Sequence, residues 1–107
     1  MSDQPQFAKQ LISKFPDQIE KRPWLYLEIL KHNYEWWELI DFIKRLQIDF
    51  SADPAIQFAL SYELSLCQYQ LGDHFNAIKI LKEIYAIDPD FRDVAILLQN
   101  WTNQNHA

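Results

Sequence analysis

The amino-acid sequence predicts an all-α fold in which about six short helices form an array of antiparallel hairpins. Three observations support this prediction. The chain of 107 residues contains one glycine, where average usage gives about seven, and a fold rich in β-hairpins needs glycine at its turns. Apolar residues recur with the helical period, and no segment shows sustained strand alternation between hairpin signals. Short breaks separate the periodic segments, so the connections are short.

The first predicted helix lies within residues 1–16. Asp3 is a candidate N-cap, and the helix ends where Phe15 precedes Pro16, because the residue before a proline is pushed out of the α region. Its apolar side chains share one helix face: Phe7, Ala8, Leu11, Ile12 and Phe15. Pro23 suits the first turn of a second helix, which ends near residues 31–33.

The third predicted helix begins at an Asn33 cap and ends near Ile48. It carries two adjacent tryptophans, Trp36 and Trp37, which lie about 100° apart around a helix. A narrow buried stripe does not hide both of them. Core packing is one interpretation and an exposed aromatic anchor for another protein is the other. The sequence leaves open which tryptophan is exposed.

The remaining helices have recognisable ends. Asp53 is an N-cap in front of a first-turn proline, and the fourth helix covers residues 55–71 up to the only glycine, Gly72, which is expected as its C-cap. Asp73 caps a fifth helix. Two aspartates at i and i+3 resemble a capping box for the last helix, over residues 90–102.

The segment 58–91 resembles a tetratricopeptide repeat, a helix–turn–helix unit that stacks into a superhelix. The resemblance rests on Leu64, Ser65, Tyr69, Gly72, Phe75, Ala77, Leu81, Asp88 and Pro89. Small residues in such a unit let the two helices approach closely, so close contacts are expected at Gly72 and Ala77. The sequence departs from the family at Ser61, which stands at the usual aromatic of the first helix.

Residues 17–50 look like a weaker copy of this unit, in one of two registers. One register pairs Trp36 with Ala77 and superimposes the apolar positions of the two copies, whereas the other pairs Asn33 with Asp73. Both registers stay open. The resemblance implies one domain, a right-handed tetratricopeptide-like α-solenoid with an N-terminal helix at 1–16, a degenerate repeat at 17–50, the best repeat at 53–91 and a terminal capping helix at 90–102.

Tetratricopeptide domains are typically non-catalytic adaptors that hold a peptide or helix in a groove lined by the first helix of each repeat. The resemblance therefore implies a protein-interaction module in which Tyr62, Leu66 and Tyr69 line an apolar and aromatic groove. Tyr26 and Ile29 join them if the second register holds. On this hypothesis, alanine at both Tyr62 and Tyr69 should abolish partner capture and unfold the protein little.

A structural subunit that associates with itself, for example as a homodimer, is the alternative function. Barely two repeats expose both lateral faces of an array, and such faces usually need capping or partners.

Composition and spacing disfavour other functions. Fifteen acidic and ten basic residues give a net charge of −5 without a basic cluster, so neither nucleic acid nor an anionic membrane is an expected partner. No apolar stretch approaches the roughly 20 residues of a transmembrane helix. With one cysteine, Cys67, and no secretion signal, a cytoplasmic protein is expected. The three histidines have no metal-ligand spacing, and no motif indicates an enzyme, a cofactor or a metal.

Overall fold

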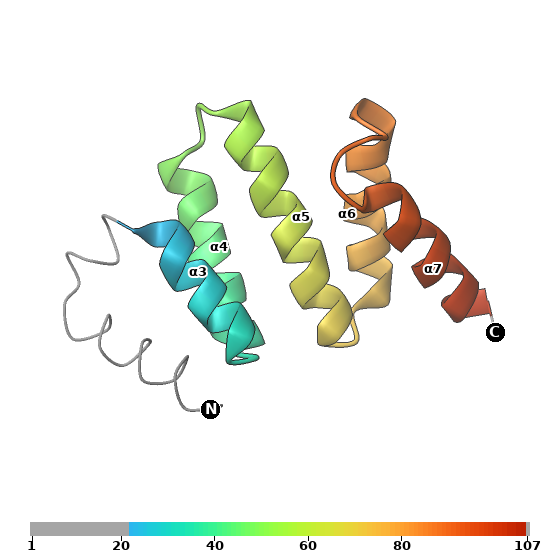
Figure 1. The fold of residues 1–107 in the computed structure, drawn as a ribbon, viewed down its shortest axis with the longest axis horizontal. Coiled ribbons are helices and arrows are strands. Elements are labelled where there is room, and N and C mark those ends of the chain that lie inside the picture. Colours follow the sequence, from blue (N-terminus) through green and yellow to red (C-terminus); the bar gives the residue numbers. More distant parts are fainter. Residues whose placement is uncertain (1–21, 107) are drawn as a thin grey trace. The chain divides into compact units, whose positions relative to one another are not determined.

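Residues 22–106 are described by a computed structural model and form five α-helices, with no strand among them (Figure 1). The helices are α3 (Pro23–His32), α4 (Trp36–Asp49), α5 (Pro54–Gln70), α6 (His74–Ile87) and α7 (Val94–His106). The all-α prediction is confirmed for this part of the chain, and the helix predicted within residues 1–16 lies outside it. None of these five helices is both long and apolar enough to cross a membrane.

The chain divides into two compact units, Met1–Phe42 and Ile43–Ala107, with the boundary inside α4. Within the first unit, the Tyr26 ring of α3 meets the Phe42 ring of α4 edge-on, with 5.0 Å between centroids. The Tyr26 hydroxyl donates to Oε1 of Glu38 at 3.1 Å. The same unit buries the apolar side chains Leu27, Ile29, Leu30, Leu39 and Ile40. Aromatic and hydrogen-bonding contacts therefore join the two helices.

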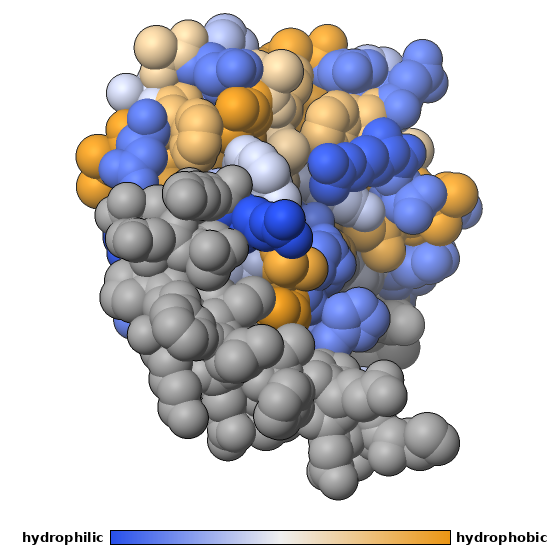
Figure 2. Space-filling view, turned by 60° about the vertical axis from the view of Figure 1, so that its left-hand side comes forward, coloured by the Kyte–Doolittle hydropathy of each residue, from blue (hydrophilic) through white to orange (hydrophobic). Residues whose placement is uncertain are grey.

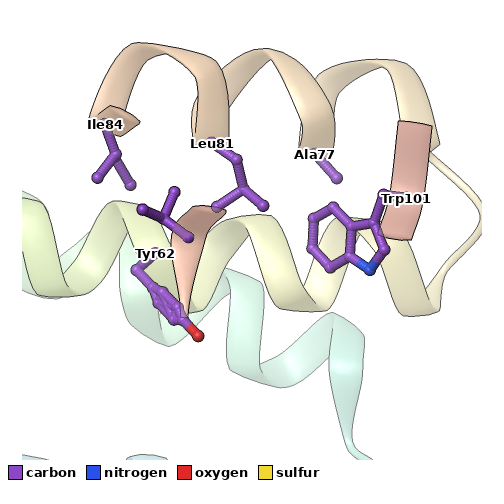
Figure 3. Close-up of a cluster of buried hydrophobic side chains, with 6 residues drawn as sticks. Tyr62, Ala77, Leu81, Ile84 and Trp101 are labelled. Carbon is purple, nitrogen blue, oxygen red and sulfur yellow. The ribbon is translucent and has the colours of Figure 1, made fainter. Parts of the chain in front are cut away.

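The core of the second unit lies among α5, α6 and α7. Figure 3 shows Ala77, Leu81 and Ile84 projecting from one side of α6, with Trp101 of α7 beside Ala77 and Tyr62 on α5. Val94 completes this buried cluster. Ala77 is fully buried, as expected for a small residue between packed helices.

The start of α5 is fixed in two ways. Asp53 caps the helix through Oδ1, which accepts from the backbone N–H of Ile56 at 3.1 Å. Gln57 donates from Nε2 to the carbonyl oxygens of Gln47 at 3.0 Å and Phe50 at 2.8 Å, and so holds the turn that follows α4. The predicted Asp53 cap is confirmed.

Gly72 ends α5 in a Schellman motif. The N–H of Asp73 donates to the carbonyl of Gln68 at 2.8 Å and the N–H of Gly72 to that of Tyr69 at 3.1 Å. Gly72 has a φ of +89°, which favours glycine, and a Cβ there would meet nothing within 4 Å. Gly72 closes α5 as predicted, although the C-cap residue itself is Leu71 and Gly72 follows it. The close contact expected at Gly72 is not found: the turn needs its φ, not its small size.

The turn between α3 and α4 repeats this motif without a glycine. The N–H of Glu35 donates to the carbonyl of Leu30 at 3.0 Å and that of Tyr34 to the carbonyl of Lys31 at 3.1 Å. Tyr34 has a φ of +58°. Asn33 is the C-cap of α3 rather than the N-cap of α4, so that prediction was wrong.

The two turns define a register in which Tyr34 corresponds to Gly72, and we call it the turn register. The helices that follow the turns, α4 and α6, are both 14 residues long, and their first residues correspond in the same register. Both residues are buried in each of three equivalent pairs: Leu39–Ala77, Ile43–Leu81 and Leu46–Ile84. The turn register therefore replaces both registers expected from the sequence.

The last helix begins later and ends later than predicted. Asp88 accepts at Oδ1 from the N–H of Asp90 at 3.1 Å, and Arg92 has a φ of +43°, so residues 88–93 form an irregular turn. Helix α7 starts at Val94 rather than near residue 90, and it continues to His106 instead of ending at residue 102.

We expect Tyr34→Gly to be about 1 kcal/mol more stable than Tyr34→Ala, because only glycine adopts a positive φ without a Cβ penalty. Both variants lose the edge-on contact of the Tyr34 ring with Trp36, so the comparison isolates the backbone effect. Gly72→Ala should lose a similar amount at the equivalent position. Urea denaturation of the three variants checks this, and equal stability of the two Tyr34 variants would contradict the positive φ.

Candidate partner-binding surface

The structure brings Tyr62, Leu66 and Tyr69 together, but it covers them. Tyr62 is 6% exposed and belongs to the core of the second unit, and Leu66 packs partly buried against the same cluster. Tyr69 stacks on His74 and on Trp101, with ring centroids 4.2 and 4.1 Å away. Phe91 in the turn before α7 and Trp101 on α7 thus cover part of the expected groove. Tyr62 is closed to a partner, whereas Leu66 and Tyr69 remain half-buried.

Tyr26 and Ile29 are buried in the first unit. They were candidates under the register that pairs Asn33 with Asp73, and the turn register makes them equivalent instead to Leu64 and Cys67, which are also buried. In the turn register the equivalents of Tyr62, Leu66 and Tyr69 are Trp24, Glu28 and Lys31. Of these, Trp24 and Glu28 are exposed, and Lys31 pairs with Glu28 at 3.6 Å between Nζ and Oε1.

Arg92 fixes the turn before α7 over α5. Its Nη1 lies 3.4 Å from Oε1 of the buried Glu63, and its guanidinium carbon lies 5.3 Å from the ring centroids of both Tyr62 and Phe91. The ion pair and the cation–π contacts offset the cost of the positive φ at Arg92. Burial raises the pKa of Tyr62, and the nearby Asp93 carboxylate raises it further.

We expect the raised pKa of Tyr62 to make the protein less stable in alkali. Well below pH 10.0, the ordinary pKa of tyrosine, both the folded and the unfolded state keep the phenol proton. Above it the unfolded chain loses the proton first, so the free energy of unfolding falls as pH rises through the higher folded pKa. Urea denaturation between pH 8 and 11 should show a smaller fall for Tyr62→Phe than for the parent. The same fall in both proteins would contradict the assignment to Tyr62.

An open apolar surface lies on α6. A hollow of about 610 Å³ is lined by Phe75, Ile78, Lys79, Lys82, Glu83 and Ala86. The spacing of these residues, i, i+3, i+4, i+7, i+8 and i+11, places them on one face of the helix. Phe75 is 79% exposed at its edge. We call this set the α6 surface.

The turn register gives α4 a related stripe: Trp37, Ile40, Lys44 and Ile48 correspond to Phe75, Ile78, Lys82 and Ala86. Trp37 is 73% exposed, whereas Trp36 is half-buried, so Trp37 is the exposed tryptophan of the pair. Ile40 is buried and Ile48 is exposed. An exposed aromatic residue thus stands at the second position of both α4 and α6.

Sequence reasoning missed this stripe although a signal for it was present. Isoleucine and lysine recur unchanged at Ile40 and Lys44, Ile78 and Lys82, but only the turn register aligns them. The other two registers superimpose apolar positions or match a cap residue, and a tyrosine in the first turn gives no sign of the turn register.

The face drawn in Figure 2 shows how apolar surface is distributed among the coloured residues. Hydrophobic and hydrophilic residues alternate there in small groups and form no single broad patch. On this face, an apolar binding surface would therefore be narrow.

Residues 22–106 contain no cluster of three or more histidine, cysteine, aspartate or glutamate side chains that could hold a metal ion. The chain matches no family model, no curated protein and no solved structure.

Proposed function

We propose that this protein is a non-catalytic protein-interaction module that binds an apolar or amphipathic segment of a partner on the α6 surface. The hollow beside the exposed Phe75 carries the proposal. Phe75 lies outside the core cluster and borders further apolar side chains, and aromatic side chains often dominate binding energy at interfaces.

The repeated hairpin supports a tetratricopeptide-like organisation. The pairs α3–α4 and α5–α6 correspond in the turn register, and in each pair the same turn motif joins the two helices. The proposal differs from the usual use of such domains, because the first-helix stripe at Tyr62 and Tyr69 lies beneath α7. The second helix carries the open surface instead. We also propose that this module acts in the cytoplasm.

A self-associating subunit is the second candidate. Exposed apolar side chains outside the α6 surface favour it, namely Ile87 at the end of α6 and Ile96 on α7. Light scattering at several concentrations distinguishes the candidates. A mass that rises to that of a dimer, and that Ile96→Ser returns to a monomer, would support self-association over binding of another protein.

Site-specific photocrosslinking tests the proposed function. A photoreactive phenylalanine at position 75 should crosslink the full chain to a discrete partner in cell lysate, and competition with unlabelled parent protein should reduce the yield. The same group at position 96 is the control, because Ile96 is also exposed but lies outside the α6 surface. Equal crosslinking at both positions would contradict a specific site on α6.

A further inference from the structure

We infer that the segment bound by the α6 surface is an acidic amphipathic helix, with carboxylates flanking an apolar stripe. This inference rests on the proposed function and adds the chemistry of the partner. Two lysines that line an apolar hollow carry it.

The charge of the α6 surface is opposite to that of the molecule. The chain has a net charge of −5, yet Lys79 and Lys82 line the hollow and Glu83 is its single acidic residue. Within residues 22–106, Lys79 and Lys82 make no ion pair, whereas Lys31 and Arg92 do. Two ammonium groups are thus available to an incoming carboxylate.

The apolar and charged parts of the surface act together. Phe75, Ile78 and Ala86 provide apolar area along about 16 Å of helix, given a rise of about 1.5 Å per residue. Lysine side chains lay their aliphatic stems along such area and keep the ammonium at its edge. A partner helix with apolar residues at i, i+4, i+7 and i+11 covers this length, and glutamates beside them meet the ammonium groups.

Helix α4 repeats this surface only in part, because Asp41 stands where Lys79 does and Ile40 is buried. Lys44 stands where Lys82 does, between an isoleucine and an exposed apolar position, and makes no ion pair within the described chain. Arg45 adds a second cation beside it, although it also approaches Asp49 at 3.9 Å. A polynucleotide would require a longer run of cations than these helices offer, so an acidic peptide fits the surface better.

The test measures binding of designed peptides to the full chain by fluorescence anisotropy. One probe is an amphipathic helix with leucines at i, i+4, i+7 and i+11 and glutamates beside them, and the other has lysines in place of those glutamates. The acidic peptide should bind at least tenfold more tightly, and the preference should shrink as salt rises. Lys79→Glu with Lys82→Glu should reverse the preference. Lys31→Glu, which lies on α3, should leave it unchanged, and circular dichroism checks that each variant is folded.

The outcomes separate the inference from the proposed function. If both peptides bind equally and Phe75→Ser abolishes binding, the surface is a binding site but the acidic partner is refuted. If neither peptide binds and position 75 gives no specific crosslink, both proposals fail. If the free chain dimerises and Phe75→Ser disrupts the dimer, the occupant is a second copy and the inference is overturned.

Discussion

Replacing Trp101 with alanine is expected to lower the free energy of unfolding by about 3–5 kcal/mol, the usual range for truncating a buried tryptophan. Trp101 is 7% exposed, and its ring stacks almost parallel to that of Tyr69, with 4.1 Å between centroids and 10° between planes. In Figure 3 it lies beside Ala77 of α6. The substitution would remove the main aromatic contact between α7 and the rest of the second unit.

Ile96→Ala is the matched control for Trp101→Ala. Ile96 lies on the same helix but is exposed, so its truncation should change stability by about 0.5 kcal/mol or less. Urea denaturation followed by circular dichroism measures both variants. If the two lose the same small amount, α7 is not docked in solution, and the stripe on α5 becomes accessible to a partner.

Helix positions followed from local chemistry wherever the local signal was unambiguous. Asp53 and Asp73 cap α5 and α6 because a carboxylate next to the first turn accepts a free backbone N–H whatever the tertiary structure is. Gly72 adopts a positive φ in the same way. These features need only neighbours along the chain, so they could be read from the sequence.

The first hairpin was placed incorrectly because its turn lacks that local signal. Tyr34 adopts a conformation that usually belongs to glycine, and its bulky side chain gives no indication of a C-terminal cap. Asn33 is a good N-cap residue, so the sequence predicts a helix start there instead. Because of this error in register, Tyr26 and Ile29 were expected in a groove, whereas they lie in the core.

The groove on α5 could not be distinguished from core by periodicity. Tyr62, Leu66 and Tyr69 lie at i, i+4 and i+7, a spacing that describes a binding face and a buried face equally well. The residues that cover this stripe, Phe91 in the turn before α7 and Trp101 on α7, decide between them. This part of the chain is positioned by contacts distant in the sequence, such as Arg92 with Glu63. No helix among residues 22–106 covers Phe75, so the α6 surface stays open.

The double variant Tyr62→Ala with Tyr69→Ala is expected to lose at least as much stability as the core truncation Leu64→Ala, for which about 2–5 kcal/mol is typical. Tyr62 packs against Phe91 with 5.8 Å between ring centroids, and Tyr69 stacks on Trp101, so the two truncations open the same core. Their effects should not be additive, because both side chains hold residues 91–101, the turn before α7 and α7 itself, in place.

Phe75→Ala is the control for the double tyrosine variant, since it truncates an exposed aromatic side chain and should cost about 0.5 kcal/mol or less. The two kinds of variant should also differ in function: Phe75→Ala should lose the partner while remaining folded, and the tyrosine variant should lose it only by unfolding. Denaturation midpoints and crosslinking yields, measured on the same preparations, test both statements. A stable tyrosine variant that fails to bind would return the binding site to α5, because only an accessible groove there produces that combination.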